Sequence, residues 1–372
     1  MVTLLELLEE MVTKNASDLH LTVAVPPVFR LDGDLVPSQH EVLRPADTQR
    51  LAFSVLSENQ KKKFEENKEL DLSFGIEKLG RFRANVFLQR GCVAMAVRLI
   101  PFVIPSFEEL GLPNVIADLA LKPRGLVLVT GPTGSGKSTT QAAMVDRINR
   151  HRSVHVVTVE DPIEFLHQHN QSIINQREVY EDTNSFVNAL KYVLREDPDV
   201  VLVGEMRDLE TMETTLRIAE TGHLALATLH TNSCDQSINR IVDAFPAHQQ
   251  AQVRTQLSFV LEGVVSQQLL PKVGGGRILA MEILICTPAI RALIRDEKVH
   301  QIYSLIQAGT KYGMRTMNQS LLELSQSGQI TMNDALKCSA KPDELKDMLS
   351  TGGLERHDQS APRWQAVKEG KK

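Results

Sequence analysis

The sequence contains few cysteines: only Cys92, Cys234, Cys286 and Cys338 occur in 372 residues, and no two form a Cys-x-x-Cys pair. This spacing argues against a disulfide framework and a cysteine zinc site, and it is typical of a reducing cytoplasm. The chain also lacks any apolar stretch near the ~20 residues that cross a bilayer. Its first residues, "MVTLLELLEEMV", carry acids and lack the basic leader of a signal peptide. We therefore expect a cytoplasmic chain that reaches a membrane only through a partner.

Positive charge and aromatic residues are also scarce. The 41 lysines and arginines are outnumbered by 46 acids, which gives a formal charge of −5, and aromatic residues make up only 5%. Surfaces that bind nucleic acid combine basic residues with aromatic stacking platforms, so we expect no nucleic-acid partner. The apolar share of 42% is enough for real cores, and the length allows two or three domains.

Residues 1–100 mix helical and extended patterns, which predicts a small N-terminal α+β domain. Asp32-Gly33, in "VPPVFRLDGDLVP", predicts a hairpin turn, and "GRFRANVFLQRGCVAMAVRLI" predicts a second strand pair that turns at Arg90-Gly91. The stretch between them, "ADTQRLAFSVLSENQKKKFEENKE", is typical of a helix with a charged end. Residues 101–113, "PFVIPSFEELGLP", contain three prolines and form the best candidate linker.

From residue 114 to 285 the pattern changes to apolar β runs that alternate with helical stretches. This alternation predicts an α/β fold with a mostly parallel sheet flanked by helices. Residues 286–350 have a helical pattern. Residues 351–372, which include the single tryptophan Trp364, have the composition of a disordered tail.

One stretch, "GLVLVTGPTGSGKSTT", carries the clearest chemistry. It matches G-x-x-x-x-G-K-[ST] with a buried strand before it and a helix after it, the setting in which this pattern binds nucleoside triphosphates. Backbone N–H groups of the loop converge on phosphate oxygens, the lysine reaches the β/γ-phosphates and the serine binds Mg²⁺. We expect ATP and Mg²⁺ at Gly131, Pro132, Thr133, Gly134, Ser135, Gly136, Lys137, Ser138 and Thr139.

Carboxylates follow two other predicted strands. "VHVVTVEDPIEF" brings Glu160, Asp161 and Glu164 past the end of one strand, and "DPDVVLVGEMRD" brings Glu205 past another. Ligands of open parallel sheets lie outside the carboxyl ends of the strands, beside the phosphate loop. Hydrolysis needs one acid on the Mg²⁺ side, for which Glu205 is our choice, and another that orients water. On local pattern alone Glu160 and Glu164 compete for that second role.

Two histidines bracket a further apolar run. In "GHLALATLHTN", His223 and His230 stand at opposite ends of a predicted buried strand. The pattern leaves structural and functional roles open for both. A metal site is disfavoured, because no third ligand clusters with them.

These motifs together resemble a known family. "GPTGSGKSTT", "VVTVEDPIEF", "LREDPDVVLVGEMRD" and "AETGHLALATLHTNS" look like the Walker A, Asp box, Walker B and His box of the secretion ATPase superfamily (the GspE/PilT family). The resemblance covers about residues 1–345. It implies a RecA-like P-loop ATPase core after a PAS-like N-terminal domain, with Glu164 activating water and Glu205 as the Walker B glutamate. It also implies that His230 contacts the γ-phosphate or its acids, and that His223 has a coupling or structural role.

Arginines of the N-terminal region acquire a role through the same resemblance. Arg81 and Arg83 lie on one face of a predicted strand, and Arg98 lies on its hairpin partner. These ATPases form hexameric rings, in which an arginine is often supplied in trans to the γ-phosphate. We expect that role for Arg83 and Arg98, and less for Arg81. In the ATPase domain Arg195, Arg207, Arg217 and Arg240 flank the motifs, and the sequence leaves open whether Arg207 instead pairs with nearby acids.

Among these ATPases the chain resembles the type that retracts type IV pili. The extra N-terminal domain and four-cysteine motif of extension and type II secretion ATPases are absent, and "AIRALIRDEK" (289–298) is present. The resemblance implies a homohexamer at the inner face of the membrane, held by the pilus platform protein, that powers twitching. Arg291 and Arg295 lack intrahelical partners at i±4 and would be free for a neighbour. The alternatives are an accessory (PilU-like) retraction ATPase, a nucleic-acid translocase, and a nucleotide switch without turnover.

Overall fold

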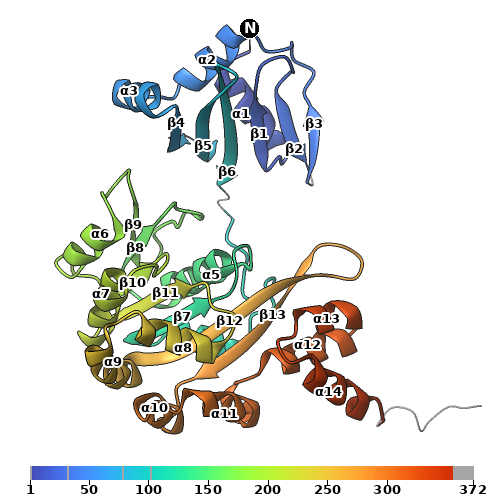
Figure 1. Cartoon of the computed structure of the whole chain (residues 1–372). Helices are drawn as coiled ribbons and strands as arrows, with labels where there is room; N and C mark the ends of the chain where they lie inside the picture. The colour runs from blue at the N-terminus through green and yellow to red at the C-terminus, as the bar shows by residue number, and fades with distance from the viewer. Residues whose placement is uncertain (1, 32, 78, 101–102, 355–372) are drawn as a thin grey trace, which may run out of the picture.

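The computed structural model of the protein describes residues 2–31, 33–77, 79–100 and 103–354. It consists of an N-terminal part, an α/β core and a group of C-terminal helices (Figure 1). Asp32 of the predicted hairpin, residues 101–102 of the proposed linker and residues 355–372 with Trp364 lie outside the described residues. The described chain confirms the predicted fold class. The domain limits given above remain proposals.

The N-terminal part is an antiparallel sheet packed against helices, which agrees with the expected α+β class. Its strand order is β3-β2-β1-β6-β5-β4. Apolar side chains on one face of the sheet, such as Leu19 and Phe82, pack with Leu7 and Leu8 of the first helix into a separate core. The elements are α1 (Leu4–Thr13), β1 (Asp18–Leu21), β2 (Val28–Leu31), β3 (Asp34–Pro37), α2 (Pro45–Phe53), α3 (Glu58–Asn67), β4 (Glu69–Ile76), β5 (Gly80–Gln89) and β6 (Cys92–Ile100).

Two local predictions in this part have different outcomes. The turn at Arg90-Gly91 is confirmed: both residues have positive φ, 51° and 78°, as a two-residue hairpin turn requires. The single helix expected between the strand pairs is wrong, because the chain leaves α2 at Ser54 and starts again as α3. Ser57 caps the new helix in a reciprocal pair with Gln60.

The core of the chain is a seven-stranded sheet with the order β13-β12-β7-β11-β10-β8-β9, parallel except for the β12–β13 pair. The predicted alternation of strands and helices is confirmed, whereas β9 and the β12–β13 hairpin were not predicted. Its elements are α4 (Asn114–Ala120), β7 (Gly125–Thr130), α5 (Lys137–His151), β8 (His155–Glu160), β9 (Ile173–Glu178), α6 (Phe186–Val193), β10 (Val200–Val203), α7 (Leu209–Glu220), β11 (Leu224–Leu229), α8 (Cys234–Asp243), α9 (Ala247–Val260), β12 (Leu261–Pro271) and β13 (Arg277–Ile285).

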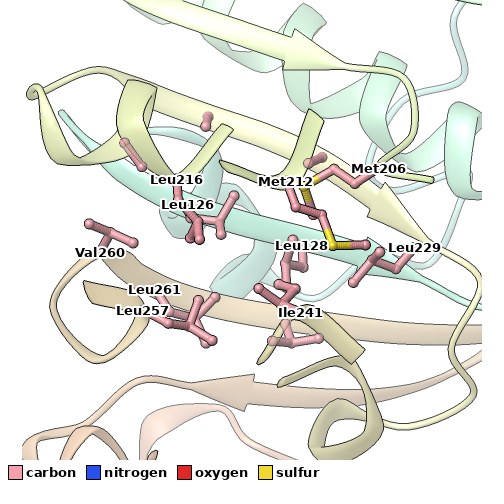
Figure 2. Packing of buried hydrophobic residues seen from close by; sticks show 14 of the residues in the cluster. Leu126, Leu128, Met206, Met212, Leu216, Leu229, Ile241, Leu257, Val260 and Leu261 are labelled. Carbon is pink, nitrogen blue, oxygen red and sulfur yellow. The ribbon is translucent and has the colours of Figure 1, made fainter. Parts of the chain in front are cut away.

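Helices cover both faces of this sheet, so alternate residues of a strand enter different apolar clusters. Figure 2 shows Leu126 and Leu128 of β7 among side chains from α7 and α9, such as Leu216 and Leu257. Val127 and Val129 point the other way, into a cluster that includes Met144 of α5. Strands buried on both faces are continuous apolar runs, which is why β7, β10 and β11 were readily predicted.

The C-terminal region is helical, as predicted, and one buried carboxylate fixes it to the core. Glu282 of β13 accepts hydrogen bonds from the backbone N–H groups of Cys234 and Met317, at the starts of α8 and α12. The region consists of α10 (Pro288–Arg295), α11 (Ile302–Ala308), α12 (Met317–Gln326), α13 (Met332–Cys338) and α14 (Pro342–Leu354). No helix in the described part of the chain combines the length and apolar character that a bilayer crossing requires.

The two arginines of α10 differ, and the prediction that both are free is wrong for Arg291. Its guanidinium donates to the carbonyl oxygens of Ser258 and Phe259, each at 2.8 Å, and to the carboxylate of Glu262 at 2.7 Å. These partners lie 29 to 33 positions upstream, where a search at i±4 does not find them. Among the described residues, Arg295 pairs with Asp296 at 3.7 Å, and its side chain is half exposed.

We expect Arg291→Ala to lower the free energy of unfolding by about 2 kcal/mol, since charged hydrogen bonds at the α9–β12 junction are lost. Urea denaturation followed by circular dichroism measures the effect. Arg295→Ala is the matched control on the same helix and should stay within ~0.5 kcal/mol of the wild type. Equal stability of the two variants would contradict a structural role for Arg291.

Candidate active site

The phosphate loop lies between the end of β7 and the start of α5, as the sequence predicts. Gly131, Gly134 and Gly136 all have positive φ, a conformation that favours glycine. At Gly131 a Cβ atom would also lie only 2.3 Å from the carbonyl oxygen of Gln267 and 2.6 Å from Oγ of Ser135. The loop therefore needs glycine at this position for close approach to β12, and not for φ alone.

Lys137 begins α5 and points back over the loop. Its Nζ donates to the carbonyl oxygens of Gly131 at 2.9 Å and Pro132 at 3.0 Å. Burial lowers the pKa of Lys137, and the nearby carboxylates of Glu164 and Glu205 act in the opposite direction. Lys137 thus shares a cleft with the two acids that the sequence assigned to hydrolysis.

A cleft of about 610 Å³ opens beside the loop and brings most of the predicted site together. Its lining combines the phosphate loop with the carboxyl ends of β8, β10 and β11, which is the edge where ligands of parallel sheets bind. The predicted residues that line it are Thr133, Gly134, Gly136, Lys137, Ser138, Thr139, Glu160, Asp161, Glu164, Glu205, Arg207, His230 and Arg98.

The two competing acids near β8 have different surroundings. Glu160 accepts hydrogen bonds from the Thr158 hydroxyl at 2.6 Å and the Gln176 amide at 3.3 Å, and burial raises its pKa to about 7. A hydrogen bond from the backbone of Glu164 opposes that rise. Glu164 itself is exposed at the cleft. Glu160 is therefore engaged in holding the loop, whereas Glu164 is open to a water molecule.

Glu205 is partnered on both carboxylate oxygens. Arg207 Nε lies 2.6 Å from Oε1, and His230 Nε2 lies 3.4 Å from Oε2. The sequence left the role of Arg207 open, and the structure pairs it with an acid. His223 is at the opposite end of β11, where its Nδ1 lies 3.0 Å from the Thr221 hydroxyl. Within one chain the structure does not bring His223 to the cleft.

The three N-terminal arginines have different partners. Arg83 and Arg98 are direct cross-strand partners on β5 and β6, and Arg98 lines the cleft of its own chain. Arg98 Nε donates to Asp18 at 2.8 Å, and its side chain is 69% exposed. Arg83 lies 3.9 Å from Asp71, and Arg81 donates to Glu178 at 3.1 Å. The sequence predicts arginines that act on a neighbour, and this stays a prediction; within the single chain Arg98 lines the cleft of its own chain.

Of the remaining arginines in the described chain, one lines the cleft without having been predicted, and three that were considered do not line it. Arg277 of β13 lines the cleft, and the sequence reasoning missed it because the β12–β13 hairpin had not been assigned. Among the described residues that line the cleft, Arg195, Arg217 and Arg240 are not found. Arg217 pairs with Glu213 on the surface of α7, and Arg195 lies over the ring of Tyr192.

The donor set fits a nucleotide-borne magnesium ion. No group of three or more His, Cys, Asp or Glu side chains able to hold a metal occurs in the described part of the chain. Magnesium bound with a nucleotide keeps waters and phosphate oxygens and takes only one or two protein ligands. Ser138 and Glu205, which both line the cleft, match that requirement.

The raised pKa of Glu160 predicts a pH-dependent stability. Because the folded-state pKa is about 7 and exceeds the unfolded value, the favourable contribution is complete below the unfolded pKa and is lost as the pH rises through 7. Glu160→Gln stays neutral, so its stability relative to the wild type should increase by about 1–3 kcal/mol between pH 5 and pH 8. Denaturant titrations at several pH values measure this difference. A difference that does not change with pH would show that Glu160 titrates in its ordinary range.

Comparison with known proteins identifies the family. The type II/IV secretion system protein family matches residues 2–275. The type IV pilus retraction ATPase PilT of Pseudomonas aeruginosa is 47% identical over 340 residues, 91% of this chain and 99% of that protein. The type IV pilus ATPase PilU of the same organism is 43% identical over 93% of this chain and 91% of that protein.

Solved structures agree with the sequence matches. The crystal structure of the pilus retraction motor PilT with bound ADP has a TM-score of 0.89 at 55% identity, and the match covers 94% of this chain and 100% of that one. The ATPase DotB of Legionella pneumophila has a TM-score of 0.73 at 25% identity, over 89% of this chain and 93% of that one. With its phosphate loop and acidic strand ends, the chain is an ATP hydrolase that belongs to the type II/IV secretion system protein family and is similar to the pilus retraction ATPases.

Proposed function

We propose that the chain is a homohexameric motor that uses ATP hydrolysis to retract type IV pili and so drives twitching. The observation that carries the proposal is the cleft, where the phosphate loop faces two carboxylates from adjacent strands and an arginine from the N-terminal part. The likeness to PilT over nearly the whole chain supports pilus retraction as the use of that hydrolysis. The motor would work at the inner face of the membrane, against the pilus platform protein.

Different residues of the cleft would bind the phosphates, hold Mg²⁺ and orient the attacking water. Loop N–H groups and Lys137 would bind the β- and γ-phosphates, and Ser138 with Glu205 would hold Mg²⁺, Glu205 through metal-bound water. When bound, Mg²⁺ neutralises charge on the phosphate oxygens. Glu164 would orient water in line with the γ-phosphate. His230 and Arg207, which share the Glu205 carboxylate, are placed to respond to the nucleotide.

Two further assignments complete the proposal. Arg98, which we assign in cis on the basis of its position in the cleft, would stabilise charge on the γ-phosphate. His223 would act at a distance from the nucleotide, as a structural or coupling residue at the far end of β11. Similarity to PilU is nearly as high, so an accessory retraction ATPase is the second candidate within the same class. Retraction by the chain in cells that lack other retraction ATPases would distinguish the two.

The acids are tested by paired glutamine variants. We expect Glu164→Gln to bind MgATP as the wild type does and to lose about 100-fold or more of turnover, since an oriented general base is removed. Glu205→Gln should also stop turnover, but with an altered dependence on Mg²⁺ concentration. Phosphate release and nucleotide binding measure both. Near-normal hydrolysis by Glu164→Gln would return the water-orienting role to Glu160.

The in-cis assignment of Arg98 is tested by mixing subunits. We expect Arg98→Ala chains to bind ATP and hydrolyse it poorly, and their mixture with Lys137→Ala chains to remain inactive. In cis, no subunit of the mixture has both an intact loop and its own arginine. Recovery of phosphate release in a subunit-exchanging mixture would instead show that the arginine acts on a neighbour, as the sequence predicted. The same mixture with Arg217→Ala in place of Arg98→Ala is the control.

A further inference from the structure

A buried glutamate links the N-terminal part to the loop that carries Glu164. Glu178 is the last residue of β9, and its side chain is only 5% exposed. Its Oε1 accepts a hydrogen bond from the Ser73 hydroxyl of β4 at 2.5 Å, and its Oε2 accepts one from Arg81 of β5 at 3.1 Å. These are contacts between residues about 100 positions apart, and both donors belong to the N-terminal sheet.

The same carboxylate also contacts the loop that carries Glu164, between β8 and β9. Glu178 Oε2 accepts the backbone N–H of Ile163 at 3.3 Å, one residue before Glu164. Glu160 reaches the same loop through Gln176, whose amide donates to Glu160 at 3.3 Å and to the carbonyl oxygen of Phe165 at 2.9 Å. The loop is therefore held on both sides of Glu164, and of these contacts the one at Glu178 depends on the N-terminal sheet.

The donors to Glu178 lie on the same face of the sheet as Arg98. Cross-strand pairing places Ser73 opposite Arg83, and Arg83 opposite Arg98, so all three share one face. Arg81 is two residues from Arg83 on β5 and shares that face as well. Docking that seats Ser73 and Arg81 on Glu178 therefore also places Arg98 at the cleft.

We propose that Glu178 is a positioning residue, which aligns Glu164 for hydrolysis only while the N-terminal sheet is docked through Ser73 and Arg81. Undocking would remove two of the three donors that the described residues supply to this buried carboxylate and would leave the Ile163 N–H. An uncompensated buried charge is strongly unfavourable, so the loop would move or admit water to solvate it. Docking of the N-terminal sheet would therefore be required for ATP hydrolysis. This inference rests on the proposed hydrolysis at Glu164.

The docked contact is also one that can be released. Arg81 offers one hydrogen bond to Glu178, and its Nε is buried with no hydrogen-bond partner among the described residues. An arginine held through both of its edges would resist separation more strongly. A contact of this strength is consistent with a domain that docks and undocks in each cycle.

The test uses steady-state hydrolysis by the full chain. For the double variant Ser73→Ala/Arg81→Ala and for Glu178→Gln, we expect kcat to fall about 10- to 100-fold. The KM for ATP should stay within about twofold, because the phosphate loop is untouched. Arg81→Lys should recover part of the loss.

Arg217→Ala, which removes a surface ion pair on α7, is the control and should leave kcat unchanged. In a double-mutant cycle, Arg81→Ala should matter less when Glu178→Gln is already present.

A second measurement does not require turnover. In nucleotide-free protein, hydrogen–deuterium exchange of peptides that span residues 160–166 should be faster in Ser73→Ala/Arg81→Ala than in wild type. Wild-type kcat together with unchanged exchange in these variants would overturn the role of Glu178. So would equal losses of kcat, ATP binding and thermal stability with no recovery by Arg81→Lys, since that result indicates a structural contact only. A wild-type chain that does not hydrolyse ATP would instead refute the proposed function, and the exchange experiment would then decide the coupling alone.

Discussion

Burial of the central parallel strands on both faces is the constraint on which the rest of the structure depends. β7, β10 and β11 have no exposed residue, so polar groups of these segments emerge only at the strand ends. Because the strands are parallel, their carboxyl ends share one edge, where the phosphate loop, Glu205 and His230 meet. The same geometry sends His223 to the opposite edge, since it precedes the strand that His230 follows. The two histidines that bracket one strand therefore have different environments.

The sequence predicts well those features whose causes are local. The phosphate loop depends on glycines within six positions and on the flanking strand and helix, and all of these can be seen in "GLVLVTGPTGSGKSTT". The Arg90-Gly91 turn is equally local. The break between α2 and α3 has a local signal as well, the Ser57–Gln60 capping pair, although the pattern of the whole stretch predicts one helix with a charged end.

Features that depend on distant partners were not predictable in the same way. Arg291 looked free because its carbonyl and carboxylate partners belong to α9 and β12, and no periodicity connects those segments to α10. Glu178 is in "IINQRE", a polar edge strand whose sequence does not reveal that two hydrogen-bond donors from the N-terminal sheet reach it. Arg277 was missed because the β12–β13 hairpin was not predicted, although apolar runs on both sides of a glycine-rich turn are a local signal for one. For Arg291 and Glu178 the missing information was the tertiary pairing of segments.

The contrast between apolar cores and polar contacts suggests how one chain can combine rigidity with motion. The N-terminal sheet has its own apolar cluster, which shares no residue with the two clusters that flank the central sheet. Moving one part against the other therefore need not open a core, and the residues that tie them here, Ser73 and Arg81, are polar. Polar contacts have small net free energies, so nucleotide binding can shift such an equilibrium. A motor of this kind requires that the rate of ATP hydrolysis depend on whether the N-terminal sheet is docked or undocked. A carboxylate shared between the moving sheet and the loop beside Glu164 satisfies that requirement with a single side chain.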